Sequence, residues 1–357
     1  MSGGSEPTRR LAYAILLVLT AINFVNYLDR QVVYAVLEPM SKELGASDAQ
    51  SGLLATVFLV AYMVASPVVG PLGDRVPRKH ITAASLTVWS LGTVGSGLAP
   101  DYATLFASRV VVGVGEAGFA AVAPTVVADL FAPDRRGRML SYFYLATPMG
   151  SALGYLLGGA VAQAHGWRAA FFVAGGPGLV LAVVAALLPE PRRGAMDASA
   201  DDPDAPPTMQ ALRRLWRSPA WRVDTAGTTL MTFALGGLAA WMPTFFQRAH
   251  GLSVGEAGTA FGGVTVVAGL LGTLLGGWLG DRAQARGPGG YFRVSGLGLL
   301  LGAPFAVVLP WVPDVTAALA VAFVAEMLLF LNTGPLNAVL VACVPTTMRA
   351  QAVAVNV

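Results

Sequence analysis

The chain has 357 residues, of which 55% are hydrophobic and only 12% are charged, with a formal net charge of +3 at pH 7. A soluble protein could not cover that much apolar surface with so few polar side chains. The single cysteine, Cys343, lies in an apolar stretch, which excludes disulfides and cysteine-ligated zinc. We expect no metal and no cofactor.

Apolar stretches long enough to cross a bilayer recur along the whole chain. A helix of about 20 apolar residues fills the hydrocarbon core, and such stretches begin near Leu11, Leu53, Ile81, Tyr102, Met139, Ala169, Val223, Gly258, Phe292 and Thr316. The sequence therefore predicts an all-α, polytopic membrane protein with ten spans, and an eleventh that starts at Gln351. A signal peptide is an alternative for the first stretch, but no small-residue cleavage site follows it.

The basic residues between the spans predict the orientation. The N-terminus and the even-numbered connections hold 18 of the 23 Lys and Arg residues, whereas the odd-numbered connections hold only Lys42, Arg168 and Arg248. Cytoplasmic loops carry the excess of basic residues, so we expect a cytoplasmic N-terminus. The net charge of +3 then reflects membrane topology rather than a nucleic-acid partner.

A six-residue pattern occurs twice, at the end of the second span and at the end of the eighth. Gly70, Gly73, Asp74 and Arg75 form the first copy, and Gly277, Gly280, Asp281 and Arg282 form the second, 207 residues later. The glycines allow two helices to approach closely, and the aspartates can accept hydrogen bonds at helix ends. We assign all eight residues a conformational role.

The repeat predicts two six-helix halves joined by a linker. Residues 1–189 form the first half and residues 221–357 the second, with the polar, proline-rich residues 190–220 as a cytoplasmic linker between them. On this division the second half lacks its last two helices, so we expect the chain to end early. Duplicated bundles are typical of secondary transporters, whose substrate site lies near the midplane.

Four charged side chains lie inside apolar spans: Asp29 and Arg30 in the first, Arg109 and Glu116 in the fourth. A charge there is costly and usually marks a substrate or proton path. Residues seven apart share a helix face about 10 Å apart, so Arg109 and Glu116 can face one cavity. Counting depth along the two spans predicts a contact between Asp29 and Arg109, with Arg30 and Glu116 nearby.

The two kinds of charge have different chemistry. A desolvated carboxylate can take a proton, whereas an arginine stays charged. Asp29 and Glu116 are therefore the predicted proton carriers, and Arg30 and Arg109 the predicted binders of a substrate anion. Glu326 and Asn332 in the tenth span are further candidate substrate ligands. The alternative is that the four charges only neutralise one another and lock the helices together.

Two glycine-rich spans carry patterns that also have a structural explanation. Gly113 to Gly118 formally matches a dinucleotide fingerprint, but that fingerprint requires a strand, a turn and a helix, and this stretch lies inside one apolar span. Gly150, Gly154, Gly158 and Gly159 in the fifth span have the helical spacing that lets membrane helices pack backbone to backbone. We expect both sets to serve packing.

The stretch from Gly70 to Lys79 resembles the signature loop of the major facilitator superfamily, and the copy ending at Arg282 is a degenerate match. The resemblance implies two six-helix bundles around a central cavity. Within the superfamily the chain resembles the spinster branch. The residues that carry this resemblance are Asn26 to Arg30, Gly113 to Ala117, Ala123 to Thr125, Ala128 to Phe131, Arg138 to Ser141, Phe143-Tyr144, Phe261 to Thr265, Glu326, Asn332, Pro345 and Arg349. That branch implies a proton-linked carrier of lysophospholipids or sphingoid phosphates.

The main alternative is a proton-coupled symporter of sugar acids, since that branch of the superfamily also has an Asn-Tyr-x-Asp-Arg first helix. It usually continues after the fourth helix with Trp-Phe-Pro, where this chain has Asp129-Leu130-Phe131. A membrane enzyme or a receptor is a further alternative, although no clustered nucleophile or metal ligands are evident. The expected partners are an amphipathic lipid or other organic anion, protons and membrane lipids. We expect a monomer in a bacterial inner membrane.

Overall fold

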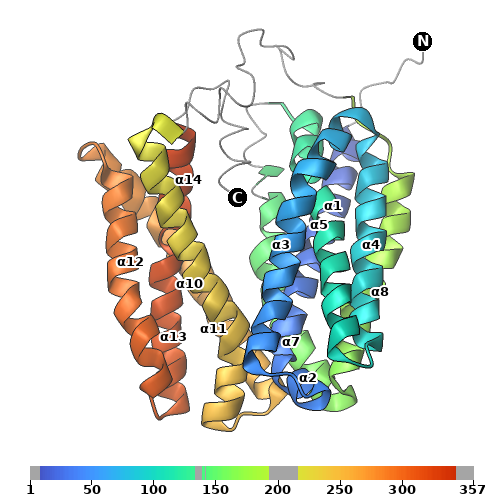
Figure 1. The fold of residues 1–357 in the computed structure, drawn as a ribbon. Helices are drawn as coiled ribbons and strands as arrows, with labels where there is room; N and C mark the ends of the chain where they lie inside the picture. The colour runs from blue at the N-terminus through green and yellow to red at the C-terminus, as the bar shows by residue number, and fades with distance from the viewer. Residues whose placement is uncertain (1–8, 133–138, 141, 193–215, 343–357) are drawn as a thin grey trace. The chain divides into compact units, whose positions relative to one another are not determined.

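The computed structural model describes residues 9–132, 139–140, 142–192 and 216–342, without the side chains at 67, 70, 71, 73–75, 337, 338 and 340–342. Within these residues the secondary structure is helical and contains no strand. The chain divides into two compact units (Figure 1). Unit 1 comprises residues 1–200 and 246–262, and unit 2 comprises residues 201–245 and 263–357.

Each of the ten predicted spans coincides with a helix or a pair of helices. The elements are α1 (Arg9–Ala35), α2 (Leu37–Leu44), α3 (Asp48–Arg75), α4 (Arg78–Leu98), α5 (Tyr102–Leu130), α7 (Ala146–His165), α8 (Trp167–Leu187), α10 (Pro219–His250), α11 (Val254–Ala285), α12 (Gly290–Val308), α13 (Val315–Phe330) and α14 (Thr333–Ala342). Nine spans in the described residues are long and apolar enough to cross a membrane. The helix α4 is not among them; serine, threonine and glycine residues recur along its length.

Polar side chains fix where several helices begin. Ser47 and Gln50 form a reciprocal capping box at the start of α3. Asp101 accepts a hydrogen bond from the Thr104 backbone nitrogen at the start of α5, and Asp314 does the same with Ala317 before α13. Gly45 ends α2 with a left-handed φ of 63°, a conformation that glycine adopts without steric cost. The helix ends thus lie where the apolar stretches stop.

In unit 1 small residues set the distances between helices. The helix α1 packs on α7 and α8, α4 packs on α5 and α8, and α3 packs on α5 (Figure 1). A Cβ added at Gly150 of α7 would lie 2.4 Å from the Phe24 carbonyl oxygen of α1, and a Cβ added at Gly154 would lie 2.5 Å from the Leu28 carbonyl oxygen. Gly158 of α7 lies against Val32 and Ala35 of α1. The packing role predicted for these glycines is confirmed.

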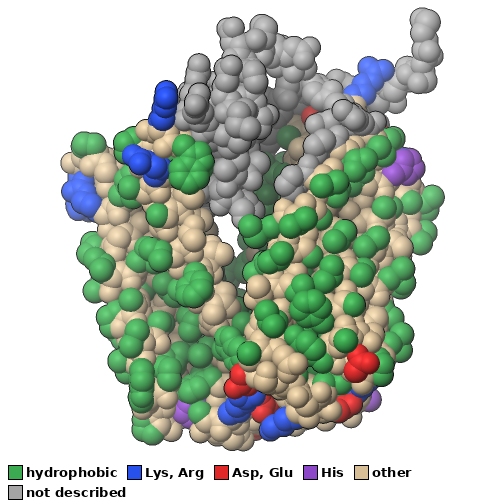
Figure 2. Space-filling view, viewed as in Figure 1, with side chains coloured by type: hydrophobic (Ala, Val, Ile, Leu, Met, Phe, Trp, Pro, Cys, Tyr) green, Lys and Arg blue, Asp and Glu red, His purple; other side chains and the backbone are tan. Residues whose placement is uncertain are grey.

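Hydrophobic side chains cover the flanks of the helices. Figure 2 shows them along the sides of the face in view, with charged side chains gathered at the helix ends. Leu17, Met63 and Val64 are 67–70% exposed, and Phe233 is 82% exposed. Contiguous apolar surface of this extent requires an apolar solvent. The flanks are those of a membrane protein.

In unit 2 the tenth span is not one continuous helix. It is divided into α13 and α14 at Leu331 and Asn332. The Asn332 side-chain amide donates to the Leu329 carbonyl oxygen at 2.8 Å, and the Asn332 backbone nitrogen donates to the same oxygen at 3.2 Å. Gly272 and Gly276 of α11 lie against the Met327 and Leu331 carbonyl oxygens, so the break also lies at a close helix contact.

Candidate functional site

Three of the four charges predicted to lie in the membrane are fully buried in unit 1. Asp29, Arg109 and Glu116 are each 0% exposed, and the Arg30 side chain is 22% exposed. They come from α1 and α5, as predicted, and α3 and α4 supply their neighbours. Buried charges require partners, so the partner of each charge indicates what that charge does.

Arg30 pairs with Glu116. The Arg30 Nε lies 2.6 Å from Glu116 Oε2, and the second carboxylate oxygen of Glu116 has no hydrogen-bond partner. Three aromatic rings surround the Arg30 guanidinium, with Cζ to ring-centre distances of 5.1 Å for Tyr27, 5.2 Å for Phe58 and 5.3 Å for Tyr62. Glu116 and these rings together hold Arg30 in the interior of unit 1.

Asp29 does not form the expected contact with Arg109. Instead its Oδ2 accepts a hydrogen bond from Thr93 Oγ1 at 2.5 Å, and its Oδ1 has no partner. The predicted pairing was wrong because adjacent residues on a helix point about 100° apart. Asp29 faces α4, while Arg30 faces α5. Thr93 was not identified from the sequence.

Arg109 is the exceptional member of the group. None of its three guanidinium nitrogens has a hydrogen-bond partner, although the side chain is fully buried. Its Cζ lies 4.9 Å from the centre of the Phe58 ring. A buried arginine cannot lose its charge, and leaving its donors unmet is costly. Five N–H donors are therefore available to an anion that enters this part of unit 1.

Gly113 brings α3 against α5 between the two charges of α5. A Cβ at this position would lie 2.4 Å from the Phe58 carbonyl oxygen and 3.1 Å from the Tyr62 backbone nitrogen. Gly115 and Gly118 lie similarly close to Trp89 and to the Ser85 hydroxyl of α4. These glycines pack helices, as the sequence predicted, and they place the aromatic rings beside the arginines.

The candidates in unit 2 are buried on α13 and at its break. Glu326 is 2% exposed, accepts a hydrogen bond from Thr265 of α11 at 3.3 Å, and leaves its Oε2 without a partner. The Asn332 side-chain nitrogen donates a hydrogen bond to the backbone at the helix break, and its Oδ1 has no hydrogen-bond partner. Both residues keep an oxygen available, and their role in substrate binding stays a prediction.

The second copy of the repeat lies at the junction of α11 and α12. Asp281 accepts a hydrogen bond from the Tyr291 hydroxyl at 2.9 Å, and the Arg282 Cζ lies 5.5 Å from the Trp278 ring centre. Gly280 lies against Tyr291 and Pro335, and Gly277 lies against Gly334. In the first copy, Gly70, Gly73, Asp74 and Arg75 belong to α3, but their side chains lie outside the described part.

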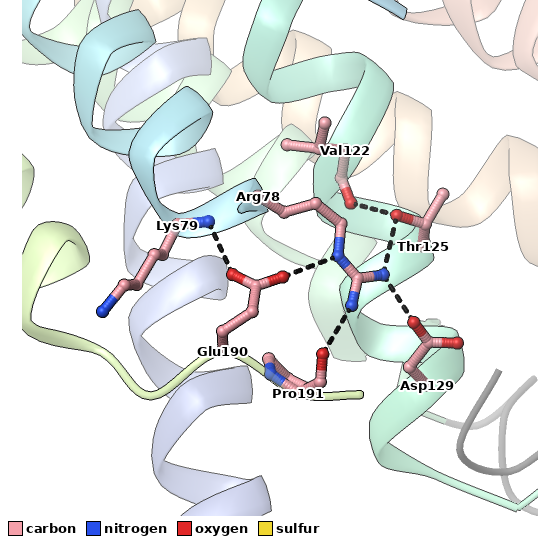
Figure 3. Close-up of polar contacts among 7 residues, drawn as sticks. All are labelled: Arg78, Lys79, Val122, Thr125, Asp129, Glu190 and Pro191. Atoms are coloured by element: carbon pink, nitrogen blue, oxygen red, sulfur yellow. Dashed lines mark hydrogen bonds and ion pairs between the residues drawn. The ribbon is translucent and has the colours of Figure 1, made fainter. Parts of the chain in front are cut away.

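A second buried arginine, Arg78, was not identified as the centre of a cluster. Figure 3 shows its guanidinium among groups from α5 and from the segment after α8. Arg78 is 3% exposed. Its Nη1 lies 2.5 Å from Asp129 and 3.4 Å from the Thr125 hydroxyl. Its Nε lies 3.1 Å from Glu190, and its Nη2 lies 3.0 Å from the Pro191 carbonyl oxygen. The available indication was that Arg78, Asp129 and Glu190 each lie at the end of an apolar span on the side predicted to be cytoplasmic.

A further ion-pair group lies at the opposite end of unit 1. Glu38 of α2, 4% exposed, pairs with Lys42 at 3.0 Å and with Arg248 at 2.5 Å, and Arg248 also pairs with Asp48 at 2.8 Å. Because residues 246–262 belong to unit 1, these pairs fasten the turn between α10 and α11 to α2 and α3. In the described residues no group of three His, Cys, Asp or Glu could hold a metal ion.

Comparison with known proteins identifies the family. The Major Facilitator Superfamily profile matches residues 19–357. The chain is 36% identical to Protein spinster homolog 1 of Xenopus tropicalis over 366 residues, covering 98% of this chain and 70% of that protein.

Solved structures agree with this result. The crystal structure of a bacterial homologue of the human lysosomal transporter Spinster, inward-facing and unoccupied, matches with a TM-score of 0.88 at 28% identity over 99% of this chain and 79% of that one. A D-xylose-proton symporter at 18% identity shares the fold, with a TM-score of 0.70 over 96% of this chain and 86% of that one. The chain belongs to the spinster branch of the major facilitator superfamily, a family of membrane transporters.

Proposed function

We propose that the protein is a proton-coupled secondary transporter of an amphipathic anionic lipid, such as a lysophospholipid or a sphingoid phosphate. The observation that carries the proposal is Arg109, a fully buried guanidinium with no hydrogen-bond partner. An anionic headgroup supplies the acceptors that this side chain lacks. The resemblance to spinster transporters supports a lipid as the molecule that bears the headgroup.

The pairing of Arg30 with Glu116 at 2.6 Å supports the coupling. When Glu116 takes a proton, it no longer holds Arg30 as an ion pair. Arg30 then becomes a second guanidinium for the substrate anion, next to Arg109. Proton binding and anion binding thus favour each other, and alternating access carries both across the membrane. Asp29, with one unmet oxygen, is the second proton carrier.

The same proposal includes location and assembly. A chain with this distribution of basic residues has its N-terminus in the cytoplasm, and we propose a monomer in a bacterial inner membrane. Protons and the lipid are its partners, and membrane lipids surround it. No chemical transformation of the substrate is part of the proposal.

The test is uptake by proteoliposomes of labelled lysophosphatidylglycerol and, in parallel, of labelled gluconate, each with and without an imposed pH gradient. We expect lysolipid movement that the gradient accelerates. In the Glu116→Gln variant we expect the gradient to have no effect while binding persists. Transport of gluconate alone would establish the sugar-acid alternative, and full gradient dependence in Glu116→Gln would exclude this acid as the coupling group.

A further inference from the structure

Phe58 of α3 contacts both arginines of the candidate site. Its ring centre lies 4.9 Å from the Arg109 Cζ and 5.2 Å from the Arg30 Cζ, and the residue is 2% exposed. An apolar span predicts a phenylalanine at such a position only as a packing residue. Its place beside two cations, one of them without any hydrogen-bond partner, requires a further explanation.

The ring provides what the arginines otherwise lack. The face of an aromatic ring attracts a cation, and the attraction is stronger where water is absent. For Arg30 the ring adds to the Glu116 ion pair and to two tyrosines. For Arg109 no hydrogen bond competes with it. The ring can therefore hold the Arg109 guanidinium in place without occupying its N–H donors.

The backbone fixes the ring in this place. Gly113 lies one turn after Arg109 and three residues before Glu116, and a Cβ there would lie 2.4 Å from the carbonyl oxygen of Phe58 itself. The close approach of α3 to α5 is therefore centred on Phe58. The next turn of α3 brings Tyr62 beside the same guanidinium: its ring centre lies 5.3 Å from the Arg30 Cζ and 6.4 Å from the Phe58 ring centre.

We propose that Phe58 is a positioning residue for anion binding, which keeps Arg109 in place and unpaired until the substrate anion arrives. This inference rests on the proposed function, because it assumes that Arg109 receives the anion. Without the ring face, the Arg109 guanidinium is free to turn toward the unmet oxygens of Asp29 or Glu116, and each substrate molecule must then displace it. The loss affects apparent affinity more than the maximal rate.

The experiment compares four proteins in proteoliposomes: wild type, Phe58→Leu, Phe58→Tyr and Phe119→Leu. Phe119 is the matched control, because it is also 2% exposed and its ring contacts are with Trp89 and Phe143. We expect Phe58→Leu to raise the KM for lysophosphatidylglycerol about 5- to 30-fold, the factor that corresponds to roughly 1–2 kcal/mol of cation–π attraction. We expect Phe58→Tyr and Phe119→Leu to stay within about 3-fold of the wild-type KM, since neither removes the ring face beside the arginines.

A fluorinated phenylalanine at position 58 tests the same claim if Phe58→Leu fails to fold. Added fluorines weaken the ring face but keep its shape, so KM should rise with each fluorine while the protein stays folded. An unchanged KM across the fluorine series, or an equal rise of KM in Phe119→Leu, would overturn the inference. Should wild type carry gluconate but not the lysolipid, the proposed substrate is wrong, and the same variants measured with gluconate still decide the role of Phe58.

Discussion

Arg78 and Arg109 are both buried arginines of unit 1, with 3% and 0% of their surface exposed, but their surroundings differ. Every guanidinium nitrogen of Arg78 has an acceptor, from Asp129, Glu190, Thr125 or Pro191 (Figure 3). No nitrogen of Arg109 has one. Burial alone therefore does not distinguish the two arginines, whereas unmet hydrogen-bonding capacity does. On our proposal the unmet donors of Arg109 are those that receive the substrate anion.

The comparison predicts that removing Arg78 has the largest effect on stability. Arg78→Met leaves Asp129, which is 7% exposed, as a buried carboxylate without its arginine. Breaking a buried pair in this way costs about 3–5 kcal/mol, measured by thermal unfolding of the purified protein. The double variant with Asp129→Asn should recover part of the loss. A stability equal to wild type in Arg78→Met would show that the cluster is not structural.

The same substitution at Arg109 should have the opposite profile. Arg109→Met removes an unpartnered buried charge, so we expect the unfolding temperature to stay constant or rise. Transport should fall about 10- to 150-fold, since hydrogen bonds to a charged group contribute about 1.5–3 kcal/mol. The measurement is lysolipid uptake per folded molecule. A large drop in unfolding temperature together with normal uptake would make Arg109 the structural arginine instead.

Gly113 of α5 allows α3 to pack closely beside the arginines of the candidate site. Gly113→Ala adds a Cβ that would lie 2.4 Å from the Phe58 carbonyl oxygen, so α3 must move away from α5, at a cost of about 1–3 kcal/mol. Gly176→Ala in α8 is the control, because nothing lies within 4 Å of a Cβ there. We expect only Gly113→Ala to lower both the unfolding temperature and the uptake. Equal behaviour of the two variants would contradict close packing at Gly113.

An exposed charged residue should have the smallest effect on stability. Glu43, in the last turn of α2, accepts hydrogen bonds from Arg168 and from Trp167. These two bonds, that from Arg168 most of all, hold the pKa of Glu43 below the ordinary 4.5. Its contribution to stability is present above that pKa and is lost as the pH falls through the lowered one.

Because this pair is exposed, the contribution is at most about 0.5 kcal/mol. Glu43→Gln should remove only this part of the acid sensitivity of unfolding, measured between pH 6 and pH 3. High salt should shrink the difference between the variant and wild type, because salt screens surface charges. A difference that is large and insensitive to salt would show that Glu43 is not an ordinary surface residue.

The sequence predicted the spans because bilayer thickness fixes the length of an apolar helix, so that length alone indicates a span. It also predicted that glycines such as Gly113 and Gly150 serve packing, since small residues at helical spacing have few other uses in a membrane. The fold of the family followed from the repeated Gly-x-x-Gly-Asp-Arg pattern. These features are local, and each can be read from one stretch of chain.

Which side chains of different helices contact one another could not be predicted from single stretches of sequence. Asp29 and Arg30 were placed at a common depth, but their neighbours depend on how α1 is rotated about its axis. Rotation sends Asp29 to Thr93 and Arg30 to Glu116. Phe58 was missed because a phenylalanine in an apolar span carries no mark of an adjacent cation. The break at Asn332 was missed because the apolar stretches on both sides were taken as one span, although Asn332 to Pro335 is a sequence typical of a helix break.

Equilibrium binding of labelled lysophosphatidylglycerol to the purified protein in nanodiscs would show whether Arg109 receives the substrate anion. Wild type, Arg109→Met and Arg78→Met are compared at equal concentrations of folded protein, with gluconate measured in parallel. We expect Arg109→Met to weaken binding of the transported anion about 10- to 150-fold. Folded Arg78→Met should bind it as wild type does. Unchanged binding in Arg109→Met would contradict the claim that this unpartnered arginine receives the substrate.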